Sequence, residues 1–146
     1  MKTTKRFDRT ISKLYPAFHN GTLDAMDCKK CAVGNMCNGD SSWKHNGFIT
    51  DTGYSPIELM WVEMIFMFGR IPENCHPDKI ISGHEKWRPD DWDASEITNN
   101  KDIQFKALCA VIEYLCELDN IPNVMDYTCL FETKEDGTPK HELCTN

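Results

Sequence analysis

The sequence predicts a mainly α fold, a small single-domain bundle of about three principal helices with long loops. Two segments, at about 4–19 and 101–118, repeat apolar residues at intervals of three and four, the spacing of one helix face. A third segment, 55–69, is apolar almost throughout and has helix-capping residues at both ends. Because 146 residues suffice for one hydrophobic core, we expect one domain over 1–131 and a flexible tail over 132–146.

The first expected helix covers about Thr4 to His19. One apolar stripe runs along it, formed by Phe7, Ile11, Leu14 and Phe18. Pro16 falls inside this helix, where it lacks a backbone donor and clashes with the carbonyl four residues earlier. We therefore expect the helix to kink or end early at Pro16, with Asn20 and Gly21 as its final stop.

The second expected helix runs from Ser55 to Gly69. Ser55 and Glu58 form a capping box, in which the hydroxyl accepts from free amides of the first turn and the carboxylate reaches back to the cap. Pro56 suits the first helical position, and Gly69 suits a left-handed C-cap. The apolar residues between the caps predict a buried central helix.

The third expected helix runs from about Lys101 to Leu118, with Asn100 as its N-cap and Asp119 just past its end. Its apolar residues again form one broad face. The segment 124–131 that follows fits a short strand or an extended packed segment, so a short strand pair stays open there.

Three cysteines in the loop-rich stretch after the first helix are the best candidate metal ligands. Cys28 and Cys31 can chelate one metal from a tight turn, and Cys37 follows nearby. A tetrahedral zinc site needs four ligands, for which His19 and His45 are the nearest additions and Cys75 and His76 are alternatives. The cysteine order does not match a plant-type ferredoxin, so one structural zinc is the expected cofactor. The competing interpretation is reduced cysteines that pack as small apolar groups.

The charge of the chain is divided unevenly along its length. Residues 1–50 carry eight Lys or Arg against four Asp or Glu, whereas residues 51–146 carry eight against nineteen. One acidic run also contains aromatic residues, so we assign it as a candidate partner-binding surface, consisting of Trp87, Asp90, Asp91, Trp92, Asp93 and Glu96. An acidic surface attracts basic proteins and repels nucleic acid phosphates, so no direct DNA binding is expected.

The sequence contains none of the motifs that identify common enzymes or membrane proteins. There is no phosphate-binding glycine loop, nucleophile elbow or zinc protease motif, so we expect no catalytic residues. The N-terminus has no apolar export segment, and the longest apolar stretch, 59–68, is far short of a membrane span. We therefore expect a cytoplasmic, non-enzymatic protein without a membrane partner.

Several segments together resemble a family of short bacterial and prophage-borne proteins. The resemblance is carried by Lys13–Tyr15, Ala17–Leu23, Cys28–Asn35 (Cys-Lys-Lys-Cys-Ala-Val-Gly-Asn), Tyr54–Leu59 and Leu115–Tyr127. Members are often labelled as a subunit of a sodium-translocating NADH–quinone reductase. Such a subunit resembles a ferredoxin joined to a flavin domain, whereas this chain has neither that cysteine order nor that length. Pro16 and Cys37 depart from the family pattern.

Two functional hypotheses follow. The first is an inhibitor or regulator of mobile-element origin, such as an anti-CRISPR protein, whose acidic and aromatic face binds a basic surface of a larger protein or ribonucleoprotein; a CRISPR effector is the candidate partner. The second is a small zinc or iron protein for redox or electron transfer that uses Cys28, Cys31 and Cys37. A nucleic-acid-binding regulator that uses the basic first helix is a third alternative, which the overall charge disfavours.

Overall fold

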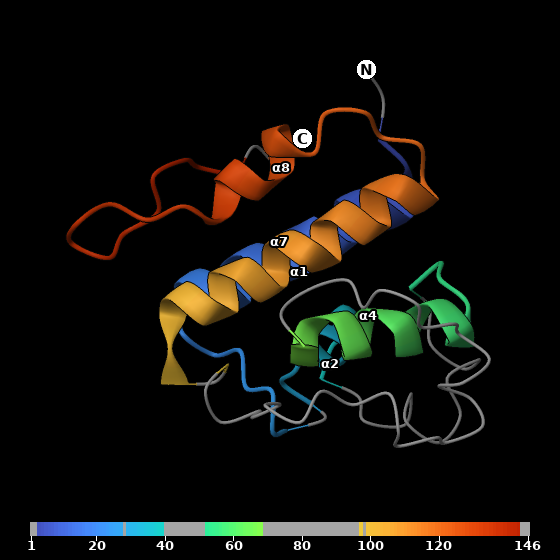
Figure 1. Ribbon diagram of the computed structural model, residues 1–146, viewed down its shortest axis with the longest axis horizontal. Coiled ribbons are helices and arrows are strands. Elements are labelled where there is room, and N and C mark those ends of the chain that lie inside the picture. The colour runs from blue at the N-terminus through green and yellow to red at the C-terminus, as the bar shows by residue number, and fades with distance from the viewer. Residues whose placement is uncertain (1–2, 28, 40–51, 69–96, 98, 144–146) are drawn as a thin grey trace.

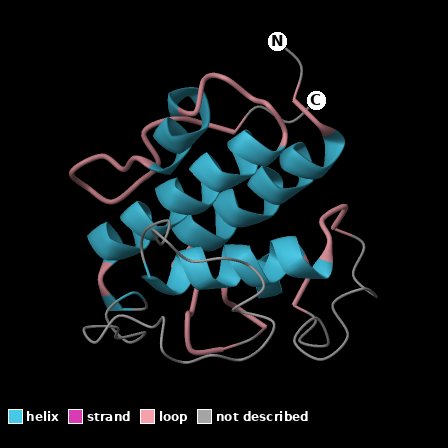
Figure 2. Ribbon diagram, turned by 45° about the vertical axis from the view of Figure 1, so that its right-hand side comes forward, coloured by secondary structure: helices cyan, strands magenta, loops and turns pink. Residues whose placement is uncertain are grey.

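A computed structural model describes residues 3–27, 29–39, 52–68, 97 and 99–143, and this part of the chain is mainly helical, as predicted (Figures 1 and 2). Its named elements are α1 (Lys5–His19), α2 (Ala32–Met36), α4 (Pro56–Phe68), α7 (Lys101–Leu118), α8 (Met125–Thr128) and the 3-10 helix η3 (Cys129–Phe131). The three expected helices correspond to α1, α4 and α7, and the short helices are additions. None of the described helices is long and apolar enough to cross a membrane.

Helix α1 begins where the sequence predicts, because the Thr4 hydroxyl accepts a hydrogen bond from the Phe7 amide at 3.2 Å. The expected early end at Pro16 is wrong, since the helix continues through this residue to His19. Because proline has no amide hydrogen, Pro16 cannot donate to the Ser12 carbonyl four residues earlier. Ser12 and Pro16 are both exposed. Water can therefore hydrate that carbonyl, which lowers the penalty for keeping proline in the helix.

Both later helices begin at the caps that the sequence predicts. The Ser55 amide donates to Glu58 Oε1 at 2.8 Å, and the Glu58 amide donates to Ser55 Oγ at 3.2 Å, which completes the capping box of α4. At the start of α7, Asn100 Oδ1 accepts from the amides of Asp102 and Ile103 at 3.0 and 3.2 Å. The predicted C-cap of α4, Gly69, lies outside the described residues.

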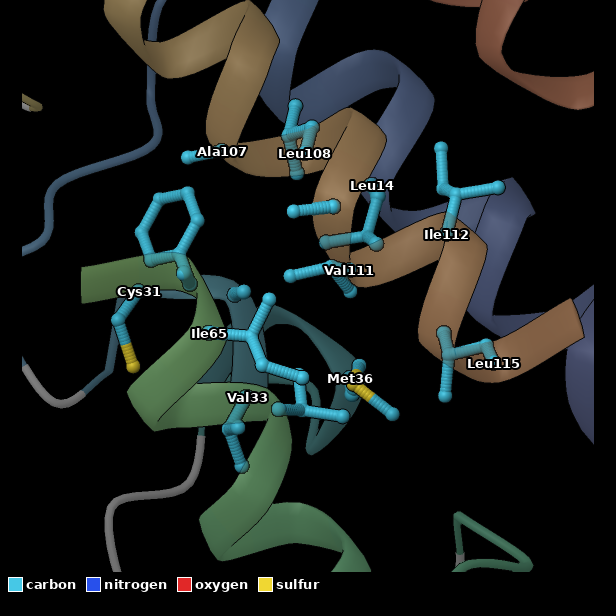
Figure 3. Packing of buried hydrophobic residues seen from close by; sticks show 14 of the residues in the cluster. Leu14, Cys31, Val33, Met36, Ile65, Ala107, Leu108, Val111, Ile112 and Leu115 are labelled. Carbon is cyan, nitrogen blue, oxygen red and sulfur yellow. The ribbon is translucent and has the colours of Figure 1, made fainter. Parts of the chain in front are cut away.

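One hydrophobic core joins these helices. Figure 3 shows side chains from four of them meeting in one space, among them Leu14 of α1, Met36 of α2, Ile65 of α4 and Val111 of α7. Helix α4 packs against both α2 and α7, while α1 packs against α2 and η3. Since burial of apolar surface is the main stabilising contribution to folding, this shared core holds the helix ends and loops in place.

The alternatives proposed for residues 124–131, a strand or an extended segment, are both wrong. The segment forms α8 and η3, because the amides of Tyr127 and Thr128 both donate to the Val124 carbonyl at 3.0 Å. Strand pairing in the described part of the chain is limited to one isolated bridge between Thr133 and Pro139. Local turns satisfy this backbone where a strand would have needed a neighbouring strand.

Residues 132–143, predicted as part of a flexible tail, form a turn that returns to the helices. The Lys134 amide donates to the Thr138 carbonyl at 2.8 Å, and the Lys140 amide donates to the Glu132 carbonyl at 3.0 Å. Further along, the Tyr15 hydroxyl donates to the carbonyl of His141. Leu143 then packs against the core, so this segment contacts α1 and the core.

Candidate functional site

The described cysteines of the predicted zinc site lie at the two ends of α2. Cys31 is the N-cap, and its Sγ accepts a hydrogen bond from the Gly34 amide at 3.3 Å. Its side chain is almost fully buried, and burial raises the pKa of the thiol, with a further contribution from the nearby Glu63 carboxylate. Cys37 is the C-cap and is also buried. Cys28 lies outside the described residues.

His19, the predicted fourth zinc ligand, faces a different neighbour. Its Nε2 lies 2.8 Å from the Leu130 carbonyl, and its ring stacks on Phe131 with centroids 6.2 Å apart. Among the described residues, no group of three His, Cys, Asp or Glu side chains is placed to hold a metal ion. Cys31, Cys37 and His19 are therefore not brought together as three ligands, and a site that includes Cys28 stays a prediction.

The other predicted site residues cannot be placed. The candidate partner-binding run, from Trp87 to Glu96, lies outside the described residues, as do the alternative zinc ligands His45, Cys75 and His76. These predictions stay untested by the geometry.

A partly buried polar cluster, which sequence reasoning missed, joins three parts of the chain. We call it the Asp119 cluster, and it consists of Thr4, Arg6, Tyr54 and Asp119. The Asp119 carboxylate accepts from Arg6 Nε at 2.9 Å, from Thr4 Oγ1 at 2.7 Å and from the Tyr54 hydroxyl at 3.1 Å. The guanidinium also lies over the Tyr54 ring, 4.2 Å from its centroid. The first turn of α1, the segment before α4 and the end of α7 are thereby tied together.

The electrostatics of this cluster indicate a structural tie. Burial by itself would raise the pKa of Asp119, whose side chain is only 1% exposed, but hydrogen bonds from Arg6, Thr4 and Tyr54 outweigh burial and lower it. The hydrogen bond to Asp119 raises the pKa of Arg6, and burial raises the pKa of Tyr54. Asp119 is thus held ionised by fixed donors, which suits an ion pair and not a general acid or base near neutral pH.

The basic side of the first helix is partly used inside the molecule. Arg6 binds Asp119, and Lys13 Nζ donates to the Met36 carbonyl at the end of α2, at 3.0 Å. Each cation therefore stabilises a neighbouring segment instead of standing free for a phosphate. The other two described cations of α1, Lys5 and Arg9, are exposed.

The two cysteines of α7 are thiols that are at least partly buried. Cys116 is buried, Cys109 is half-buried, and burial raises the pKa of each thiol to about 11. Both are therefore protonated near neutral pH, which makes them poor nucleophiles.

A pocket of about 230 Å³ opens where the end of α1, the start of α7 and the chain after η3 meet. We call it the aromatic pocket, lined by Phe18, Lys101, Asp102, Phe105, Phe131, Glu132 and Thr133. The Lys101 ammonium lies 4.2 Å from the centroid of the Phe18 ring and donates to the Phe18 carbonyl. Partial burial lowers the pKa of Lys101.

Exposed carboxylates dominate the C-terminal third of the described chain. Within 113–143, six acidic residues are exposed against two lysines, Lys134 and Lys140. We call these six the acidic set: Glu113, Glu117, Asp126, Glu135, Asp136 and Glu142. Part of the negative charge expected from the sequence is therefore accessible to a partner.

The chain matches no protein-family model, no curated protein and no solved structure. The resemblance to prophage-borne proteins accordingly stays a sequence-based expectation.

Proposed function

We propose that this protein is a cytoplasmic, non-enzymatic inhibitor that binds a basic surface of a larger protein or ribonucleoprotein. The observation that carries this proposal is the acidic set, whose six exposed carboxylates outnumber the exposed lysines of the same segment three to one. Such an excess of exposed negative charge speeds encounter with a basic partner and opposes contact with nucleic acid phosphates. The run from Trp87 to Glu96 would add aromatic anchors to the same interaction.

The mechanism would be competition for a surface that normally holds nucleic acid. Channels that hold guide and target strands in CRISPR effectors are positively charged, so an effector of this class is the candidate target. An acidic protein in that channel excludes the target strand, or it holds the effector and its guide RNA in an unproductive state. Both modes need a folded acidic surface and neither needs a catalytic residue.

The test is binding to a purified CRISPR effector, with and without guide RNA, followed by competition with target DNA. We expect a Kd in the micromolar range or below, which weakens as salt increases. The double variant Glu113→Gln/Glu117→Gln removes two exposed carboxylates one turn apart on α7 and should weaken binding several-fold. Lys106→Gln, which removes an exposed cation from the same helix, is the matched control and should not weaken it. Lack of binding to either effector form at micromolar concentration contradicts the proposal.

The zinc or redox alternative depends on Cys28 and on how it meets Cys31 and Cys37. Elemental analysis of the purified protein separates the two proposals, because one equivalent of zinc or iron favours the metal protein. Replacing Cys28 with serine should then abolish the bound metal while the acidic set is unchanged.

A further inference from the structure

The aromatic pocket has the size of a site for one side chain. Its volume of about 230 Å³ lies below the roughly 300–1,000 Å³ typical of pockets for drug-sized ligands. Its walls come from three separate parts of the chain, namely the end of α1, the first turn of α7 and the residues after η3. We propose that this pocket receives an arginine side chain from the basic partner, an inference that rests on the proposed function and names what that partner presents.

The interior of the pocket already accommodates a cation. Lys101 places its ammonium over the Phe18 ring and against the Phe18 carbonyl, at the C-terminal end of α1. Ring faces and the carbonyl end of a helix both attract positive charge. Phe105, which is half-buried, provides a further ring beside Phe18, with centroids 6.5 Å apart. A second cation entering from solvent would meet the same kind of surface.

The charged groups that line the pocket favour a cationic ligand over an anionic one. Asp102 is exposed and Glu132 is half-buried, so two carboxylates oppose the single ammonium of Lys101. Glu132 also forms an ion pair with Lys140 at 3.6 Å, but the Glu132 and Lys140 side chains are 41% and 56% exposed, and ion pairs open to solvent contribute little to stability. An incoming cation can therefore take the place of Lys140, whereas a phosphate would be repelled by both carboxylates.

The mixture of rings and carboxylates favours guanidinium over ammonium. A guanidinium is planar and weakly hydrated, so it stacks on an aromatic ring while its five N–H donors reach carboxylates around it. A lysine ammonium is more strongly hydrated and acts as a point charge, so it loses more on entering a partly aromatic site. Arginine is also enriched at the energetically important centres of protein interfaces.

The probe for this test is N-acetyl-arginine amide, titrated into the 15N-labelled full chain and followed by NMR. We expect saturable shifts of the amides of Asp102, Phe105, Glu132 and Thr133. N-acetyl-citrulline amide, which has nearly the same shape without the charge, should shift them much less. Glu132→Gln should weaken arginine binding about threefold to fivefold, in the range of a partly exposed charge pair. The matched control Glu113→Gln removes an exposed carboxylate of α7 outside the pocket and should leave binding unchanged.

The inference is overturned if citrulline amide shifts these amides as much as arginine amide does. Equal weakening by Glu113→Gln and Glu132→Gln, or absence of shifts up to the solubility limit of the probe, also overturns it. The same variants measured against the CRISPR effector separate this inference from the proposed function. Effector binding that falls with Glu113→Gln/Glu117→Gln but not with Glu132→Gln rejects the pocket alone. Arginine shifts in the pocket without any effector binding reject the proposed function alone.

Discussion

At the scale of single residues, Gly53 occupies a position where both the backbone conformation and the available space favour glycine. Its φ of +85° lies in the left-handed region, and its carbonyl accepts a hydrogen bond from Arg6 Nη1 at 2.9 Å. A Cβ added here would lie 2.7 Å from the Arg6 Cβ, which cannot move without moving α1. The residue therefore lets the segment before α4 approach the first turn of α1 closely.

We predict that Gly53→Ala destabilises the protein by about 2–4 kcal/mol, the combined effect of a strained φ and an overpacked contact. Gly21→Ala is the matched control, because Gly21 has a φ of +70° with nothing within 4 Å of an added Cβ. It should lose only the conformational contribution of about 1–2 kcal/mol. Urea unfolding of both variants measures the difference, and equal losses would disprove the close contact.

Asp119 is the second residue whose surroundings make a quantitative prediction. Asp119→Asn keeps the shape of the side chain but removes the charge that three donors share. We expect a loss of about 1.5–3 kcal/mol in the free energy of unfolding at pH 7, the range for hydrogen bonds to charged groups. Asp126→Asn removes an exposed carboxylate and should change it by less than about 0.5 kcal/mol.

The same cluster predicts how stability depends on pH. Since the folded pKa of Asp119 is lowered from 3.8, its ionised form contributes stability that is fully present above pH 4. As the pH falls below 4 and through the lowered pKa, the folded protein must protonate this carboxylate, and the contribution is lost. The stability difference between wild type and Asp119→Asn should therefore shrink below pH 4. A difference that stays constant from pH 6 to pH 2.5 would contradict the lowered pKa.

At the scale of elements, the starts of α4 and α7 were predictable because N-terminal capping is local. The capping box of α4 joins Ser55 to Glu58, which are three residues apart in sequence. The Asn100 side chain likewise accepts a hydrogen bond from the amide of Ile103, three residues further along the chain. Residues 124–131 were harder, since a short apolar run suits a strand or a helix until its neighbours are known. The Asp119 cluster could not be predicted at all, because the three side chains that donate to Asp119 are 65 or more positions away from it in sequence.

Ser55 provides the test at this scale. Ser55→Ala removes the hydroxyl that accepts from the Glu58 amide at the start of α4. We predict a loss of about 1 kcal/mol in unfolding free energy, typical of an N-cap. Ser12→Ala is the control: Ser12 is exposed within α1, and alanine has a higher helix propensity, so stability should stay unchanged or rise slightly. Similar losses for both variants would argue against a capping role.

At the scale of the whole molecule, the end of the domain depends on whether residues 132–143 are part of the folded unit. Sequence composition suggested a boundary after residue 131, because Gly137 and the polar residues around it do not predict an element. The contacts that residues 132–143 make with the helices join positions far apart in sequence, so local composition cannot predict them. Tyr15 of α1 donates to the His141 carbonyl, and Leu143 packs on the core.

Two truncations measure what this segment contributes. Ending the chain after residue 131 removes the Tyr15 hydrogen bond, the turn at 132–140 and the Leu143 contact, so we expect a loss of about 1–3 kcal/mol in unfolding free energy. Ending it after residue 143 keeps all of these and should match the full chain. If the shorter truncation were as stable as the full chain, residues 132–143 would be an appendage and the domain would end at residue 131. If it is less stable, the aromatic pocket belongs to the folded unit, since Glu132 and Thr133 on its wall are positioned by the same segment.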